Sequence, residues 1–326
     1  MLHFRAQLAR ESWETELVDF LTFIERYRKL ADWAQVGLPQ PDLPSMSYAS
    51  DLRHYASEAD ARRLRDAWGL GDVPIGLEIF DLLEARGISV YRDASTTEEI
   101  SGAYFRDDRV GPILFVNASE WPYRQVFTAA HELAHLIYDH RSGFSRNLAR
   151  TNEERMCNRF ASAFLMPQSA IETELARRET RHERIKADDV LALHRTFGVS
   201  YGAMLVRLKT LGILRSDRYE ELKAVHPVQK AIQQGYVVEP WEYGYRSEEV
   251  GAGERLRWLP RRFLHLVHLA VQEGHISDRK AAQYVNLEYE EWLKATHNVP
   301  RTQGGRETEE RLRARDLRAS EALIAP

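Results

Sequence analysis

The sequence holds a single cysteine, Cys157, among its 326 residues. One cysteine cannot form a disulfide bond within the chain, which excludes a fold held together by disulfides. No apolar run approaches the roughly 18 residues that a membrane-spanning helix needs, and the N-terminal residues lack the apolar segment of a signal peptide. These absences predict a cytoplasmic protein that has no membrane partner.

A strong charge of one sign is also lacking, because 45 basic residues are matched by 49 acidic residues and the net charge is −4. A basic field over the whole molecule, typical of nucleic-acid-binding proteins, is therefore excluded, while a local basic patch is not. Direct nucleic-acid binding stays open on this ground. Hydrophobic residues make up 44% of the chain, which is enough to form a buried core.

Three regions are expected along the chain. Residues 1–50 combine an amphipathic helical segment with a linker, since the three prolines within Pro39–Pro44 exclude a helix there. Residues 51–215 mix helical and strand patterns and are expected to form the central domain. Residues 216–326 are expected to be a mainly helical regulatory or interaction region, and its last part, residues 301–326, alternates in charge like a solvated helix or a disordered tail.

Three β-rich segments precede a long apolar helix in the central domain. Residues 88–91, 101–105 and 113–116 predict a small sheet that is antiparallel in part. The edge of such a sheet can hold an extended substrate through main-chain hydrogen bonds, although packing against the helix explains the strands equally well. Strands that are flanked by helices indicate an α+β fold.

The helix after these strands contains the sequence FTAAHELAHLIYD, residues 127–139. On a helix, His131 and His135 lie one turn apart on the same face and can bind the same metal ion, and two neutral imidazoles suit zinc. Glu132 lies about a hundred degrees further round and can take a proton from water beside the ion. The stretch is apolar nearly all round and is expected to be buried, where a zinc ion would satisfy both histidines.

A catalytic zinc ion needs a third protein ligand and keeps a water molecule as its fourth. The next predicted helix, residues 153–166, offers Glu154, which lies one turn before Cys157 on the face that continues through Ala161. Cys157 itself is interpreted as a small core residue. The other candidates for the third ligand are Glu153, Asp139, His140 and a thiolate at Cys157.

These two helices also carry a family likeness. The segment RQVFTAAHELAHLIYDH at residues 124–140, followed by NEERMCNRFASAFLMP at residues 152–167, resembles the ImmA/IrrE metallopeptidases. The likeness extends over about residues 55–215, and Phe164 departs from the family pattern where leucine is usual. The resemblance implies a zincin-like metallopeptidase domain, which helical N- and C-terminal regions would flank.

The resemblance also implies roles for single residues. His131, His135 and Glu154 would bind Zn²⁺, and Glu132 would be the catalytic carboxylate of a zinc metallo-endopeptidase. Members of the family are implied to cleave DNA-binding helix-turn-helix repressors and so to derepress stress-response or mobile-element genes. The competing hypothesis is a zinc-stabilised regulator or antitoxin that binds protein or DNA without cleaving. An intact Glu132 argues against that hypothesis, since a structural site needs no base.

Several other features of the sequence say less about function than the two helices do. A peptidase usually has a second electrophile, for which the candidates are Tyr104, Tyr138, His194 and Tyr201. Residues 187–211 have the spacing of a helix-turn-helix but few basic side chains, which favours a packing unit of the peptidase domain. Residues 276–293 repeat that spacing with acidic side chains, which favours a protein-binding module. Residues 216–258 lack a regular pattern and are expected to be a connecting region.

Overall fold

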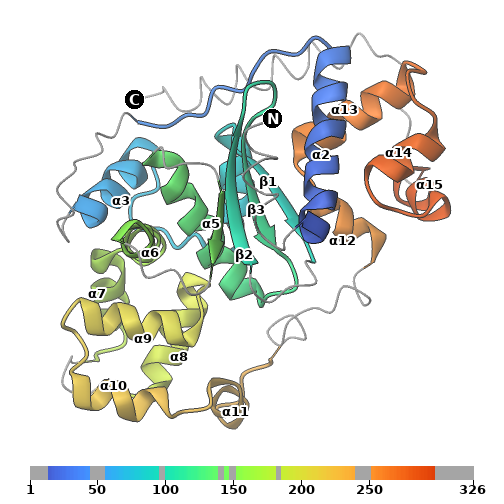
Figure 1. The fold of residues 1–326 in the computed structure, drawn as a ribbon. Helices are drawn as coiled ribbons and strands as arrows, with labels where there is room; N and C mark the ends of the chain where they lie inside the picture. The colour runs from blue at the N-terminus through green and yellow to red at the C-terminus, as the bar shows by residue number, and fades with distance from the viewer. Residues whose placement is uncertain are drawn as a thin grey trace, which may run out of the picture.

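The computed structural model describes residues 14–44, 56–94, 100–138, 143–146, 152–180, 185–238 and 251–297. The fold is α+β, as predicted, with one small mixed sheet between two groups of helices (Figure 1). In the part of the chain that is described, no helix is both long and apolar enough to cross a membrane. The division of the chain at residues 50 and 215 stays a prediction.

The sheet has four strands in the order β1-β3-β2-β4. β1 (Ser89–Asp93) pairs with β3 (Gly111–Asn117) in parallel, and β2 (Ile100–Asp107) pairs with β3 in antiparallel. These are the three predicted strands. The sequence did not predict β4 (Gly143–Arg146), which pairs with β2 and forms the edge strand beside it. A substrate that added to this side of the described sheet would therefore have to pair with β4.

Both faces of the sheet are buried, and successive residues of each strand alternate between two hydrophobic cores. One core lies on the side of helix α5 (Pro122–Ile137) and includes the strand residues Val90, Tyr104, Leu114 and Val116. The other core lies on the opposite side and includes the strand residues Tyr91, Ala103, Phe105, Ile113 and Phe115. This period of two follows from the pleat of a strand. Burial on both sides explains why successive residues of β3, from Ile113 to Val116, are all apolar.

Helix α5 lies across the sheet and is almost completely buried. Pro122 occupies its first turn, where the missing N–H costs nothing, and no charged residue interrupts it between Thr128 and Ile137 except Glu132 and the two histidines. Helix α6 (Asn152–Leu165) packs against α5, and α3 (Ala56–Ala67) packs against α6. These contacts fix the two helices that were predicted to carry the metal ligands.

Helix α4 (Ile79–Ala85) follows a single 3-10 turn at Gly76–Glu78 and leads into β1. It ends before Gly87, which adopts a left-handed φ of 76° and donates its N–H to the carbonyl of Glu84 over 3.2 Å. A residue with a side chain would be strained there, which explains the sharp turn from helix to strand.

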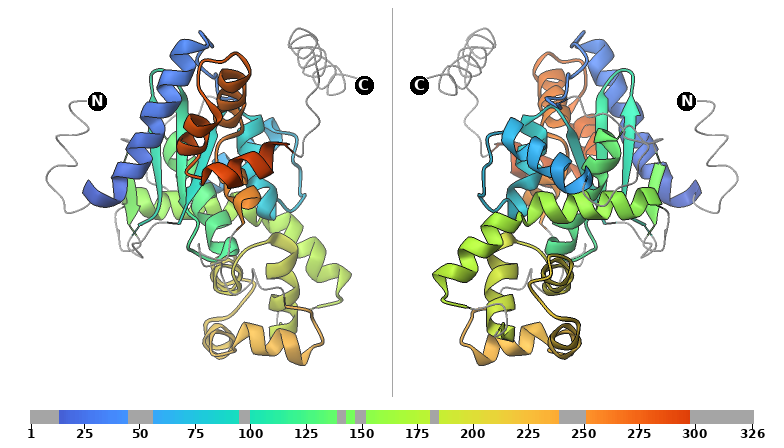
Figure 2. Two further views of the ribbon diagram at one scale, coloured as in Figure 1. Left: turned by 90° about the vertical axis from the view of Figure 1, so that its right-hand side faces the viewer. Right: turned by 90° about the vertical axis from the view of Figure 1, so that its left-hand side faces the viewer.

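A group of five helices forms one end of the molecule, shown in yellow-green to amber in Figure 2. They are α7 (Gln168–Arg177), α8 (Ala187–Phe197), α9 (Tyr201–Thr210), α10 (Ser216–Lys223) and α11 (Pro227–Gln233). The expectation that residues 216–258 lack regular structure is therefore wrong for α10, α11 and α12 (Ala252–Arg257). These helices are too short to show periodicity in the sequence. Tertiary packing stabilises them, since Leu222 and Ala231 are buried in the main core, which is the core on the α5 side of the sheet.

The opposite side of the sheet is covered by helices from both parts of the chain that flank the central region. Helix α2 (Glu14–Trp33) packs against α13 (Arg261–Gln272), and the Phe23 and Phe263 rings lie edge to face with centroids 5.0 Å apart. Helices α14 (Asp278–Tyr284) and α15 (Tyr289–His297) complete this side (Figure 1). Ser277 is the N-cap of α14, since its hydroxyl accepts from the N–H of Lys280. Residues 301–326 lie outside the described residues.

Candidate metal centre

The structure brings His131, His135 and Glu154 together at the contact between α5 and α6. Their nearest ligand atoms all lie within 4.8 Å of one another. The two Nε2 atoms are 3.1 Å apart, and the Glu154 carboxylate lies 2.9 Å from Nε2 of His131 and 3.5 Å from Nε2 of His135. Two helices therefore present three donors of the type that zinc binds: two imidazole nitrogens and one carboxylate.

The orientation of His131 shows that this cluster fits a cation. The side-chain oxygen of Asn158 lies 3.0 Å from Nδ1 of His131 and can only accept, so that Nδ1 carries the proton. Nε2 of the neutral ring then carries a lone pair and no proton, and this lone pair faces a carboxylate oxygen of Glu154. Two electron-rich atoms at this distance repel unless a proton or a metal ion lies between them. The donor set and its geometry therefore fit a divalent metal ion.

Glu132 lies beside the cluster on α5 and its side chain is completely buried. Its carboxylate packs against the backbone of β2 at Gly102. A Cβ atom at position 102 would lie only 2.8 Å from Oε1 of Glu132 and 2.5 Å from the methyl group of Thr128. Glycine is therefore required here for strand β2 to approach α5 this closely. This close approach fixes the position of the Glu132 carboxylate.

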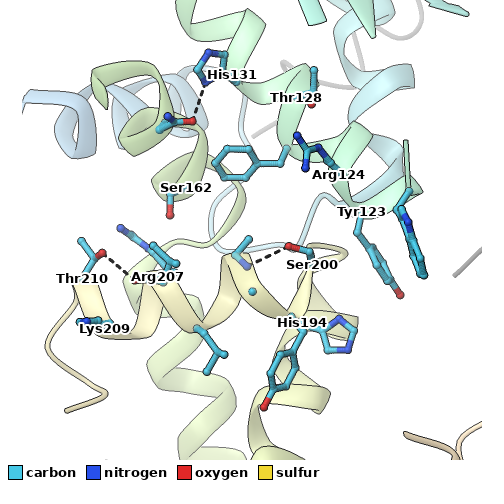
Figure 3. Close-up of a pocket in the computed structure, with 18 of the residues that line it drawn as sticks. Tyr123, Arg124, Thr128, His131, Ser162, His194, Ser200, Arg207, Lys209 and Thr210 are labelled. Carbon is cyan, nitrogen blue, oxygen red and sulfur yellow. Dashed lines mark hydrogen bonds between the residues drawn. The ribbon is translucent and has the colours of Figure 1, made fainter. Parts of the chain in front are cut away.

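A cleft of about 1270 Å³ opens beside the cluster. His131, Glu132 and Glu154 line it on one side, and the α8–α9 unit lines it on the other. Figure 3 shows His131 and Thr128 above, and below them Arg207 and Thr210 on α9 with Ser200 at its N-cap. Two of the three donors, His131 and Glu154, thus lie in the wall of a space that is large enough to admit several residues of a peptide.

Comparison with known proteins agrees with this geometry. A model of the family Peptidase_M78, the IrrE N-terminal-like domain, matches residues 83–209. This chain carries an ImmA/IrrE-family peptidase domain. No curated protein matches the sequence. Among solved structures, a Mycobacterium tuberculosis transcriptional regulator matches with 18% identity and a TM-score of 0.36, and the match covers 60% of this chain and 54% of that one. The chain thus spans about half the length of that protein.

The electrostatics of the ImmA/IrrE-family domain are set by the same cluster. Burial alone would lower the pKa of His135, but hydrogen bonds with Cys157 and Glu154 and the charge of Glu132 raise it to about 11. Burial alone would raise the pKa of Glu154, but hydrogen bonds with His131 and His135 and the charge of His135 lower it to about 2. The site thus favours a positive charge held between an imidazole and an ionised carboxylate.

The structure also places the other candidates for the third ligand. Glu153 is exposed, whereas Glu154 is half-buried and faces the two histidines. Cys157 is completely buried and hydrogen-bonds with His135, so it lies next to a donor of the cluster rather than in the cleft. Burial also raises the pKa of the Cys157 thiol, which favours the neutral form. Asp139 and His140 lie outside the described residues.

Of the four candidates for a second electrophile, two line the cleft of the ImmA/IrrE-family domain. His194 is buried, and burial lowers its pKa to about 4. Its Nδ1 donates to the carbonyl of Val199 over 3.1 Å, so the neutral ring has only an acceptor left. The hydroxyl of Tyr201 donates to the carbonyl of Leu222. Tyr104 and Tyr138 are buried in the main core and are not among the cleft-lining residues.

Two residues that shape the site were not predicted from the sequence. Asn158 lies one turn after Glu154 on α6, at a spacing of four residues, and this spacing is the signal by which it could have been found. Gly102 gave no local signal, because its importance arises from a contact with Thr128 and Glu132 on another element.

Proposed function

We propose that this protein is a zinc-dependent endopeptidase in which His131, His135 and Glu154 bind the ion and Glu132 is the catalytic carboxylate. The observation that supports this best is the convergence of the three donor groups, which lie within 4.8 Å of one another, with His131 and Glu154 in the wall of a wide cleft. A peptidase family membership for residues 83–209 supports the same reaction class.

The roles of the side chains follow from their positions. A bound zinc ion supplies a Lewis acid that activates water and polarises the carbonyl of the scissile bond. The carboxylate of Glu132 accepts the proton of the attacking water and then delivers it to the nitrogen that leaves. The contact with Gly102 holds this carboxylate in place, and Asn158 holds the ring of His131 in the tautomer that leaves Nε2 free to bind.

The proposed substrate is a DNA-binding repressor, whose cleavage in the cytoplasm would derepress stress-response or mobile-element genes. This part of the proposal rests on the resemblance to the ImmA/IrrE metallopeptidases. We further propose that residues 51–215 form the peptidase domain and that residues 216–326 regulate it.

The experiment uses the full chain loaded with zinc and a repressor protein encoded next to its gene. Wild-type protein is expected to produce two fragments of the repressor, which mass spectrometry identifies, and a chelator is expected to abolish the cleavage. Glu132→Gln should keep one zinc ion per chain and lower the cleavage rate by about 10²- to 10⁴-fold, because it removes the proton acceptor. His131→Ala should lose both zinc and cleavage.

Two outcomes would contradict the proposal. Cleavage by Glu132→Gln at the wild-type rate would show that another group moves the proton. Tight binding of the repressor with no cleavage under any metal condition would support a regulator that acts by binding alone.

A further inference from the structure

The wall of the cleft beyond the metal centre has an uneven distribution of charge. Arg155 and Arg159 on α6 both line it, one turn apart. On the opposite wall, α9 contributes Val206, which is 52% exposed, and Lys209. Apart from Glu132 and Glu154 at the metal centre, Glu58 is the one acidic residue among the described lining residues. The cleft therefore has an excess of positive charge outside the metal centre.

Glu58 does not offset this excess, because it already has a partner. Its carboxylate forms an ion pair with Arg207, which is only 1% exposed. Among the described residues, no acidic side chain forms an ion pair with Arg159. A half-buried guanidinium in such a position is stabilised by an anionic group, and a bound ligand can supply one.

The chemistry of the cleft favours a peptide over a nucleic acid as that ligand. Exposed apolar side chains, among them Trp121 at 45% exposure and Val206, line the cleft together with the basic ones. A peptide of mixed apolar and acidic residues matches both properties.

We infer that this cleft binds an extended segment of the substrate protein whose acidic side chain pairs with Arg159, about two or three residues from the bond that is cut. The inference rests on the proposed peptidase function and names the sequence that the same site selects. Five residues along α6 separate Glu154 from Arg159, a rise of about 7.5 Å. An extended peptide covers that distance in about two residues, since each adds about 3.3 Å.

The test measures binding separately from cleavage. Zinc-loaded Glu132→Gln protein is titrated into fluorescein-labelled dodecapeptides of alanine, leucine and serine, each with one glutamate or one lysine at a chosen position. We expect the best glutamate peptide to bind about tenfold more tightly than its lysine counterpart, and the difference to shrink with added salt. Arg159→Glu should reverse the preference for glutamate over lysine.

Arg177→Glu is the matched control, because Arg177 is 73% exposed on α7 and does not line the cleft. This variant should leave the preference unchanged. Equal affinity for the two peptides, or the same change in both variants, would overturn the inference. Tighter binding of a single-stranded DNA oligonucleotide than of any peptide would also overturn it, in favour of a nucleic-acid ligand.

A failure of the inference can be distinguished from a failure of the proposed function. If wild-type protein cuts glutamate and lysine peptides at the same rate, the peptidase function stands and the charge preference is wrong. If Glu132→Gln protein prefers glutamate peptides but wild-type protein cuts none of them, the binding preference stands and the hydrolytic function is wrong.

Discussion

At the scale of single residues, the contact between Asn158 and His131 decides how well the site can bind metal. The Asn158 oxygen accepts from Nδ1 of His131 and so directs Nε2 towards Glu154 and His135. Removing such a partner of a metal ligand commonly lowers metal affinity by about 10- to 100-fold. Asn158→Ala is therefore expected to weaken zinc binding by this factor, as measured by competition with a chromophoric chelator.

Asn158→Asp provides the control, since a carboxylate accepts the same hydrogen bond. It should keep the wild-type zinc affinity or increase it. Asn158 is exposed on α6, and neither substitution should prevent folding. If Asn158→Ala bound zinc as tightly as the wild type, the positioning role of this residue would be refuted.

The sequence predicted that His131, His135 and Glu154 come together, but it did not predict the contact of His131 with Asn158. The spacing of His131 and His135 fixes their common face on any helix, and Glu154 was placed on the correct face of the following helix. Sequence reasoning failed for the second electrophile. Hydrogen bonds with Val199 and Leu222 occupy the donor groups of His194 and Tyr201, and no pattern in the sequence reveals those contacts.

At the scale of elements, the close approach of β2 to α5 determines the position of the Glu132 carboxylate. An added Cβ at Gly102 would overlap with Thr128 and Glu132, and the ends of these two side chains would have to move. A displacement of about 1 Å at a catalytic group can lower the rate about 100-fold. Gly102→Ala is thus expected to lower kcat by about 10- to 100-fold while one zinc ion per chain is retained.

Gly253→Ala is the matched control for this substitution. Gly253 lies in helix α12, and nothing lies within 4 Å of the position that its Cβ would occupy. This variant should show the wild-type rate and zinc content. An unchanged kcat for Gly102→Ala would mean that the position of Glu132 does not depend on β2.

The elements that were predicted correctly have strong local patterns. Strands β1, β2 and β3 each contain a short group of β-branched, aromatic or other apolar residues, and α5 and α6 are long amphipathic or apolar helices. Strand β4 has only four residues and exists through its pairing with β2. Helices α10 and α11 have only eight and seven residues, so their stability comes from packing on α8 and α9, which no local pattern encodes.

At the scale of the whole molecule, Glu84 connects the peptidase domain to the C-terminal helices. Its two carboxylate oxygens accept from the N–H of Val90 in β1 and from the N–H of Arg261 at the start of α13, 177 residues further along the chain. Burial raises the pKa of Glu84 to about 7, although both of these hydrogen bonds lower it in part. This carboxylate therefore titrates near neutral pH in the folded protein.

The sign of the resulting pH dependence follows from this raised pKa. The folded state holds the Glu84 proton up to about pH 7, whereas the unfolded chain releases it near the ordinary glutamate pKa of 4.5. The contribution of Glu84 to stability is therefore fully present below about pH 4.5 and is lost as the pH rises through about 7, a change of about 3 kcal/mol. Glu84→Gln cannot ionise and should remove this decline.

Urea unfolding of both proteins between pH 4.5 and 8 measures the effect, and the difference between the two curves isolates Glu84 from the other carboxylates. The difference in free energy of unfolding should change by about 3 kcal/mol over this range. Parallel curves would contradict the raised pKa of Glu84.

The association of the two ends of the chain could not be predicted from the sequence. Helix α2 and helix α13 each show an apolar face, but nothing in their sequences says that the faces meet on the same side of the sheet. The contact between Phe23 and Phe263 joins residues from opposite ends of the chain, and only the three-dimensional structure reveals it.

The central claim is that His131, His135 and Glu154 hold one zinc ion and leave a place for solvent. Zinc-edge X-ray absorption of the metal-loaded protein tests this most directly, because nitrogen and sulfur ligands differ in distance. We predict two imidazole nitrogens and additional oxygen at about 2.0–2.2 Å, and no sulfur. A sulfur ligand at about 2.3 Å would identify Cys157 as a ligand and contradict the account.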